Sequence, residues 1–180
     1  MTTQKQHDRR RLLLGFAGLS LLGGALWGVR DVAFPTAKKP EPGWHGKVID
    51  VHDGDTIKVL HGETKETIRL AGIDAPEKDQ PFGLAARDWL ARECQGGEIR
   101  IVESGKDRYG RTIGDVHLAG RWLNKALAER GYAWHYKQYS QSKDLAAAEA
   151  DARKAKRGLW IDLDSPSPPV PPWEWRKDHR

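Results

Sequence analysis

Residues 46–60 read Gly-Lys-Val-Ile-Asp-Val-His-Asp-Gly-Asp-Thr-Ile-Lys-Val-Leu, and this stretch decides the class of fold. Two runs rich in β-branched residues, Gly46–His52 and Thr56–Leu60, lie on either side of Asp53-Gly54. An Asp-Gly pair between two such runs is typical of a β-hairpin. The stretch therefore predicts two antiparallel strands joined by a short turn.

Further strands and helices are predicted beyond this hairpin. Strand patterns follow at Thr67–Ile73, Glu98–Val102 and Ile113–Leu118. Helical patterns occupy Pro81–Cys94, Arg121–Arg130 and Ser142–Arg157. Short strands linked by hairpins favour antiparallel pairing, and five of them suit a small closed barrel of the OB type better than a parallel sheet. The sequence thus predicts an α+β fold built on a five-stranded OB-fold β-barrel.

Acidic side chains gather at the ends of the predicted strands. Asp53 and Asp55 lie in the hairpin turn, while Asp74 and Glu77 follow the third strand. A single aspartate in a turn is common, because its side chain can bond nearby backbone amides. That explanation does not account for two acidic pairs at neighbouring strand ends. Two of these carboxylates could hold a hard cation such as calcium, and a third could serve as a base.

Two arginines accompany these carboxylates. Arg69 and Arg111 carry planar donor forks that suit two phosphate oxygens at once, which lysine cannot imitate. Either could instead be an ordinary arginine on a strand surface. Arg111 follows Tyr109-Gly110, where glycine permits close backbone approach and tyrosine can stack on a base. Carboxylates and guanidinium groups together form a set suited to phosphodiester cleavage.

Three strings of this sequence resemble the staphylococcal nuclease (thermonuclease) family. They are Asp53-Gly54-Asp55-Thr56, Arg69-Leu70-Ala71-Gly72-Ile73-Asp74-Ala75-Pro76-Glu77 and Asp107-Arg108-Tyr109-Gly110-Arg111. The resemblance extends from about Gly43 to Trp175 and implies a five-stranded barrel with three helices. It also implies that Asp55 and Asp74 bind Ca²⁺ directly, together with the backbone carbonyl of Ala75.

The resemblance also implies roles for the other residues. Glu77 would activate or orient the attacking water, and Asp53, behind the metal ligands, would orient a metal-bound water. With Arg69 and Arg111, Glu77 completes the expected catalytic set. The residues expected to contact the nucleotide are Arg108, Tyr109 and Tyr136.

The expected function is that of a calcium-dependent nuclease acting on DNA and RNA, on single strands or open regions. The resemblance implies 3′-phosphate products. We expect a monomer, and no protein partner is evident. The alternative is a non-catalytic OB module that binds single strands at the membrane. A degenerate copy of that kind should lack at least one of the carboxylates or arginines, and this chain lacks none.

Charge is distributed unevenly along the chain. The formal net charge is +5, yet residues 44–162 carry 20 Lys/Arg against 19 Asp/Glu. Most of the excess therefore lies outside the predicted catalytic domain. Nucleic-acid binding must depend on where basic residues are placed and not on a global field.

The first thirty residues resemble a targeting segment. Arg9-Arg10-Arg11 precedes an uncharged run, Leu12–Val29, whose 18 residues would cover about 27 Å as a helix. Residues 1–33 are thus expected to form an N-terminal hydrophobic helix, either a single membrane anchor or a cleaved signal. A loose likeness to a twin-arginine signal also exists. Each alternative places the rest of the chain outside the cytoplasm, on the periplasmic side.

The remaining boundaries follow from composition. A proline-containing linker is expected at 34–43, the nuclease-like domain at 44–162 and a Pro/Trp-rich tail at 163–180. The tail suggests a polyproline conformation. It could dock on the domain through its tryptophans or, in a membrane-tethered adaptor, recruit a partner. Cys94 is the one cysteine, and a buried packing role is favoured over a reactive thiol.

Overall fold

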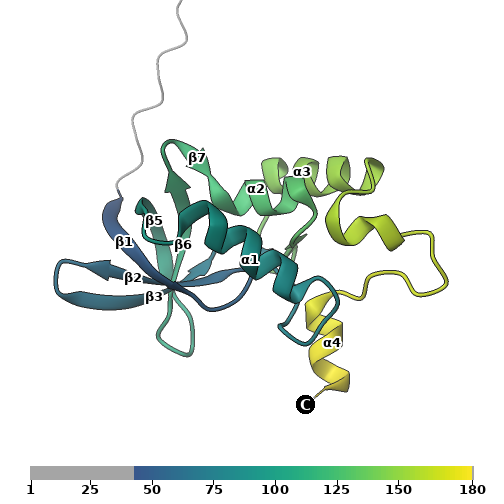
Figure 1. Ribbon diagram of the computed structural model, residues 1–180, viewed down its shortest axis with the longest axis horizontal. Helices are drawn as coiled ribbons and strands as arrows, with labels where there is room; N and C mark the ends of the chain where they lie inside the picture. Colours follow the sequence, from purple (N-terminus) through teal and green to yellow (C-terminus); the bar gives the residue numbers. More distant parts are fainter. Residues whose placement is uncertain (1–42, 180) are drawn as a thin grey trace, which may run out of the picture. The chain divides into compact units, whose positions relative to one another are not determined.

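The computed structural model describes residues 43–179, which belong to one compact unit (Figure 1). The predicted N-terminal helix and nearly all of the predicted linker lie outside these residues. Within the described part of the chain, no helix is both long enough and apolar enough to cross a membrane.

Five strands form a closed barrel, as predicted. They are β1 (Trp44–Val51), β2 (Thr56–His61), β3 (Thr64–Leu70), β5 (Glu98–Lys106) and β6 (Thr112–Leu118). Their order is β3-β2-β1-β5-β6, and a parallel pairing of β3 with β6 closes the barrel. The two-residue β7 (Arg121–Trp122) extends the sheet beyond β6. The OB-like architecture expected from the strand pattern is therefore present.

The hairpin that decides the fold is present, and its turn is fixed by its own first carboxylate. Strands β1 and β2 pair antiparallel up to Val51 and Ile57. In the turn between them, the backbone N–H of Asp55 donates to Asp53 Oδ1 at 3.0 Å. Aspartate favours such turns for this reason. The turn leaves Asp55 at the start of β2, at one end of the barrel.

The third predicted strand is broken in a way that matters for the site. The expected run Thr67–Ile73 divides into β3 and a separate short strand, β4 (Ile73–Asp74). The chain turns between them at Gly72, whose φ of +71° suits glycine. Strand β4 then pairs with β8 (Trp134–His135), away from the barrel sheet. The break carries Asp74 out of the barrel ladder and beside residues 134–136.

Four α-helices occur among the described residues, one more than the three expected. They are α1 (Gly83–Cys94), α2 (Leu123–Arg130), α3 (Lys143–Lys154) and α4 (Pro172–Asp178), with a 3₁₀ helix at Gly158–Asp162. The polyproline prediction for the tail is wrong beyond Pro171, whose φ of −65° and ψ of 146° still match it. Helix α4 forms because Pro172 is tolerated in a first turn, and Glu174 there and Arg176 in the last turn suit the helix dipole.

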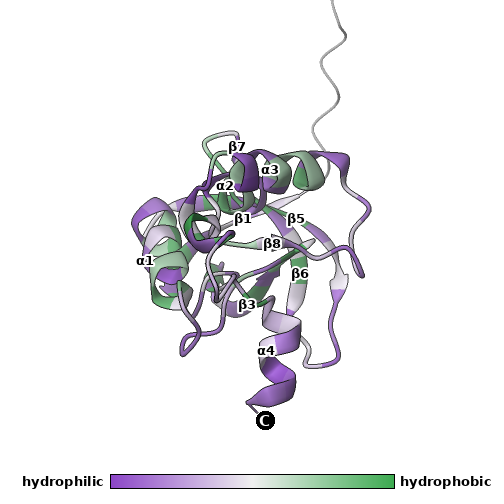
Figure 2. Cartoon of the chain, turned by 90° about the vertical axis from the view of Figure 1, so that its right-hand side faces the viewer, coloured by the Kyte–Doolittle hydropathy of each residue, from purple (hydrophilic) through white to green (hydrophobic). Residues whose placement is uncertain are grey.

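Two apolar clusters support these elements. The larger one fills the barrel and the space under α1 and α2. The smaller one contains Trp134, Leu159 and Trp160, with Trp173 of the tail packed against it. In Figure 2 the last residues of α4 are hydrophilic, and the apolar contact of the tail comes from Trp173 in its first turn. Tryptophan contact with the domain therefore agrees with the docking alternative for the tail.

Cys94 lies in the larger cluster and is fully enclosed. Its Sγ donates to the carbonyl oxygen of Leu90 at 3.1 Å. Burial raises the pKa of the Cys94 thiol to about 12, with the charge of Glu93 adding to the effect. The thiol therefore stays protonated at neutral pH, and the expected packing role is confirmed.

Candidate active site

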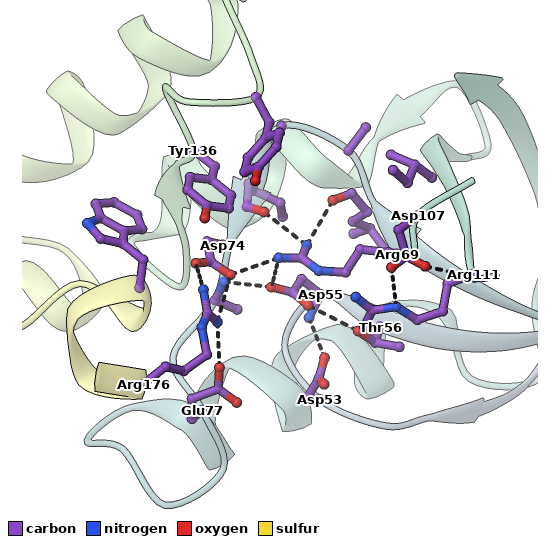
Figure 3. Close-up of a pocket in the computed structure, with 18 of the residues that line it drawn as sticks. Asp53, Asp55, Thr56, Arg69, Asp74, Glu77, Asp107, Arg111, Tyr136 and Arg176 are labelled. Carbon is purple, nitrogen blue, oxygen red and sulfur yellow. Dashed lines mark hydrogen bonds and ion pairs between the residues drawn. The ribbon is translucent and has the colours of Figure 1, made fainter. Parts of the chain in front are cut away.

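A single pocket of about 1310 Å³ collects every residue that the sequence pointed to. It is lined by residues of the β1–β2 turn, of β3 and β4, of the β5–β6 loop, of the segment after β8 and of α4. The predicted residues among its lining are Asp53, Asp55, Arg69, Asp74, Ala75, Glu77, Arg108, Tyr109, Arg111 and Tyr136. Figure 3 shows most of these side chains converging.

Asp55 is held deep in this pocket, with 5 % of its surface exposed. Its Oδ2 accepts the backbone N–H of Ala75 at 2.7 Å, and its Oδ1 accepts the hydroxyl of Thr56 at 3.1 Å. Burial raises the pKa of Asp55 to about 8, against the lowering effect of Arg69 and with the help of Asp53 and Asp74. Asp55 thus costs free energy to ionise even with Arg69 beside it, and a further cation would lower that cost.

Asp74 is the more deeply buried of the two central carboxylates. It is 1 % exposed, and its partner across the β4–β8 pair is Trp134. Arg69 Nη2 contacts Asp74 Oδ1 at 2.8 Å and Asp55 Oδ2 at 3.0 Å. Because the two oxygens meet one nitrogen, carboxylates from the β1–β2 turn and from β4 converge on the same point (Figure 3). This is the arrangement expected of oxygen ligands for a hard cation.

Arg69 owes its position to the barrel. Its place on β3 is fixed by pairing with Thr56 of β2 and Ile113 of β6. Its Nη1 donates to the carbonyl oxygens of Leu70 at 3.0 Å and Ile73 at 2.9 Å. The backbone of the β3–β4 turn therefore holds one edge of the guanidinium while the carboxylates take the other.

Arg111 belongs to the β5–β6 loop, and Asp107 shapes that loop. Asp107 Oδ1 accepts the backbone N–H groups of Tyr109 at 2.9 Å and Arg111 at 3.0 Å. Its Oδ2 accepts Nε of Arg111 at 2.7 Å. Burial acts to raise the pKa of Asp107, but these hydrogen bonds outweigh it and lower the pKa. Asp107 stays ionised and orients the Arg111 guanidinium at the pocket wall.

Tyr109 stands at the rim of the same loop with 68 % of its surface exposed. Arg108 and Arg111 lie over its ring, 4.8 and 5.6 Å from the centroid. An exposed aromatic face next to two guanidinium groups can stack on an unpaired base while the arginines face its phosphates.

Tyr136 reaches the pocket from the segment that follows β8. Its backbone N–H donates to the carbonyl oxygen of Gly72 at 2.9 Å, which places it directly after β8. Its ring is stacked on Trp173 of α4, with centroids 5.2 Å apart and planes 4° from parallel. Tyr136 is thus a pocket residue, but one face of its ring is already covered by the tail.

Glu77 follows β4 in the loop that leads to α1. Its Oε1 accepts Nη1 of Arg176 at 2.6 Å, and Nη2 of the same arginine lies 2.7 Å from Asp74 Oδ2. Sequence reasoning missed Arg176, which lies just beyond the region of resemblance. The pattern that could have found it is helical: Trp173 and Arg176 are three residues apart and share a helix face.

Metal-binding capacity rests on few side chains. Across residues 43–179, no group of three or more His, Cys, Asp or Glu side chains is arranged to hold a metal ion. The converging pair Asp55 and Asp74 would need main-chain oxygens and water to complete a coordination shell, which calcium tolerates.

A closed barrel with buried carboxylates, arginines and an exposed aromatic ring in one pocket suits a hydrolase that cleaves phosphodiesters. A family model described as staphylococcal nuclease homologue matches residues 67–162. The chain belongs to this family, and its class of enzyme is that of a nuclease.

Similar proteins carry names that agree with this class. A protein of Escherichia coli O157:H7 named an uncharacterized endonuclease is 41 % identical over 133 residues, covering 73 % of this chain and 84 % of the relative. A micrococcal nuclease of Shigella flexneri is 36 % identical over 150 residues, covering 76 % and 84 %. A staphylococcal-like nuclease of Arabidopsis thaliana is 40 % identical over 116 residues, covering 64 % and 35 %.

Proposed function

We propose that this nuclease is calcium-dependent and hydrolyses DNA and RNA at single-stranded or open regions, leaving 3′-phosphates. The observation that carries the proposal is the convergence of Asp55 and Asp74 on one point, with Glu77 and two arginines around it. Each of these groups has a distinct use in phosphodiester hydrolysis.

Calcium suits the donor set at Asp55 and Asp74. Both carboxylates are buried and share the guanidinium of Arg69, and Asp74 also contacts that of Arg176. The backbone carbonyl of Ala75, directly after Asp74, would supply a third oxygen. Calcium accepts such irregular mixtures of carboxylate, carbonyl and water, whereas magnesium demands a stricter octahedron. When bound, the ion would withdraw charge from the phosphate.

The chain's own residues would divide the remaining work. Glu77 would accept a proton from the water that attacks phosphorus in line with the 5′-oxygen. The bond between phosphorus and that oxygen then breaks, and the leaving oxygen takes up a proton from solvent water to become the 5′-hydroxyl. Arg69 and Arg111 would donate to the equatorial oxygens, where negative charge grows in the transition state. Asp53 would hold the β1–β2 turn and the water around the ion in place.

Preference for open strands follows from charge and stacking. The domain is nearly balanced in charge, so it has little general attraction for duplex DNA. Tyr109, with Arg108 and Tyr136, would bind the nucleotide by stacking and charge, and stacking needs an accessible base face. Equal rates on G/C-rich duplex, A/T-rich duplex and single strands would contradict this preference.

The direct test is digestion of plasmid DNA and RNA by the full chain, with calcium and with a chelator. We expect cleavage with calcium, none with chelator, and 3′-phosphate ends on the products. Binding of single strands without any cutting would instead support the non-catalytic OB module.

The place of action is a separate proposal that rests on Arg9–Val29. This segment would export the domain to the periplasmic side and either anchor it in the membrane or be cleaved. Protease added to spheroplasts should digest the domain. Protection equal to that of a cytoplasmic marker would contradict export, and the mass of the purified protein distinguishes anchor from cleaved signal.

A further inference from the structure

The loop that carries Glu77, the proposed base, gives its side chain little support. Glu77 lies in the irregular segment 75–82 between β4 and α1, and 37 % of its side chain is exposed. The other central carboxylates, Asp55 and Asp74, are almost completely buried. A carboxylate at a half-exposed loop position loses rotamer freedom only if a partner holds it.

That partner is Arg176 of the C-terminal helix. Its guanidinium bridges two carboxylates: Nη1 lies 2.6 Å from Glu77 Oε1, and Nη2 lies 2.7 Å from Asp74 Oδ2 (Figure 3). Asp74 is fixed by the β4–β8 pair. Arg176 therefore links the partly exposed carboxylate of Glu77 to the buried carboxylate of Asp74, with charge-assisted bonds that are stronger than neutral ones.

A second tie connects the tail to the backbone of the same loop. Gln80 is buried, and its Oε1 accepts the backbone N–H of Glu77 at 3.1 Å. Its Nε2 donates to the carbonyl oxygen of Val170 at 2.5 Å. One amide side chain thus connects the base's own backbone to the residue that precedes the Pro171-Pro172 pair.

The tail can hold the segment 75–82 in this way because the tail is itself packed against the domain. Pro172 is buried, and Trp173 stacks on Tyr136 while packing against the cluster around Trp134 and Trp160. Arg176 follows Trp173 by three residues, one helical turn along α4. Anchoring the first turn of α4 places the guanidinium over the two carboxylates.

We propose that the segment Val170–Arg176 is a positioning element for Glu77, in which Arg176 orients the carboxylate and the Gln80–Val170 bond holds its backbone. This inference rests on the proposed role of Glu77 as the base. Arg176 lies outside residues 67–162, the part matched by the family model. The nuclease domain of this chain therefore needs its C-terminal tail for full turnover.

The first experiment compares steady-state cleavage of single-stranded DNA by the full chain and by Arg176→Ala. A misplaced catalytic group costs up to about a hundredfold, so we expect kcat to fall by about ten- to a hundredfold with KM changed less than about twofold. Arg176→Lys, which keeps charge but not the bidentate fork, should recover part of kcat. Arg121→Ala is the matched control, because this arginine also pairs with a glutamate, Glu93, but lies outside the pocket.

The decisive arm combines Arg176→Ala with Glu77→Gln. If Arg176 acts through Glu77, the second substitution should add almost nothing to the loss caused by Glu77→Gln. Amide hydrogen exchange at residues 77–80 should also become faster in Arg176→Ala and stay unchanged in Arg121→Ala.

Three results would overturn the inference while leaving the proposed function intact. The first is an unchanged kcat in Arg176→Ala. The second is a rise in KM alone, which would indicate that Arg176 contacts a substrate phosphate. The third is increased activity, which would indicate that Arg176 inhibits the site. In each case Glu77→Gln would still lower turnover by about 10² or more. If Glu77→Gln were itself fully active, both the base assignment and the positioning role would be wrong.

Discussion

Two arginines reach Asp74 from opposite parts of the molecule. Arg69 comes from β3, has a side chain 15 % exposed and contacts two carboxylates and two backbone carbonyls. Arg176 comes from a seven-residue helix at the C-terminus, has a side chain 36 % exposed and contacts Asp74 and Glu77. The guanidinium of Arg69 thus belongs to the barrel, whereas that of Arg176 belongs to the C-terminal tail.

The two arginines should therefore differ in how much they contribute to the stability of the fold and to turnover. Removing one partner of a buried ion pair leaves an uncompensated charge and is costly, whereas a partly exposed pair contributes little to stability. Arg69 should therefore matter for both folding and activity. Arg176 should matter mainly for activity, because solvent can replace it at the edge of the pocket.

The largest expected effect follows from that contrast. Arg69→Ala should lower the free energy of unfolding by about 3 kcal/mol, because Asp55 and Asp74 lose the buried guanidinium that they share, and should abolish cleavage. Arg176→Ala should cost less than about 1 kcal/mol. Urea denaturation followed by tryptophan fluorescence measures both. Equal losses in the two variants would contradict the distinction between barrel and tail.

Arg111 provides a third case, an arginine placed by a loop. Arg111→Lys should reduce cleavage by about tenfold or more while leaving the unfolding midpoint near that of the wild type, since an ammonium cannot bond Asp107 and phosphate as a planar fork does. Initial rates on single-stranded DNA test this. Full activity of the lysine variant would mean that charge alone suffices at this position.

Asp55 and Asp74 should control calcium affinity, whereas Glu77 should not. Asp55→Ala should raise the half-saturating calcium concentration by at least about tenfold, the scale seen even when groups behind metal ligands are removed. Glu77→Gln should leave calcium binding by calorimetry nearly unchanged. Magnesium should substitute poorly in every variant. An unchanged calcium titration in Asp55→Ala would remove this residue from the metal site.

The smallest effect concerns His135, the residue next to Trp134 in β8. Burial lowers its pKa, against the raising effect of Glu149, so the unfolded chain takes up a proton before the folded one does. The free energy of unfolding should therefore fall as pH drops below about 6.5, the ordinary pKa of histidine. The fall between pH 7 and pH 5 should be smaller in His135→Gln. An equal fall in the wild type and in His135→Gln would contradict this contribution of His135.

Much of the barrel and its site could be predicted because the informative residues mark strand ends. Asp53-Gly54 sets the hairpin, and the hairpin brings Asp55 toward the end of β3, where Arg69 and Asp74 lie. These contacts depend on local turns and strand pairing, which leave a clear pattern in the sequence.

The tail could not be predicted in the same way. Its prolines indicated an extended chain, yet a helix begins at Pro172, because proline's missing N–H costs nothing in a first turn. The contact of Arg176 with Asp74 spans about a hundred positions of sequence. It depends on Trp173 finding Tyr136, and no local pattern encodes that pairing.

In the proposed mechanism, Glu77 accepts the proton of the attacking water. The most direct measurement compares calcium-dependent cleavage of single-stranded DNA by the full chain and by Glu77→Gln, each saturated with calcium. Turnover of Glu77→Gln should be lower by about 10² or more with the fold and nucleotide binding retained, because a neutral amide cannot accept the proton. Near-full activity of Glu77→Gln would contradict it, and catalysis would then depend on the metal ion and the arginines alone.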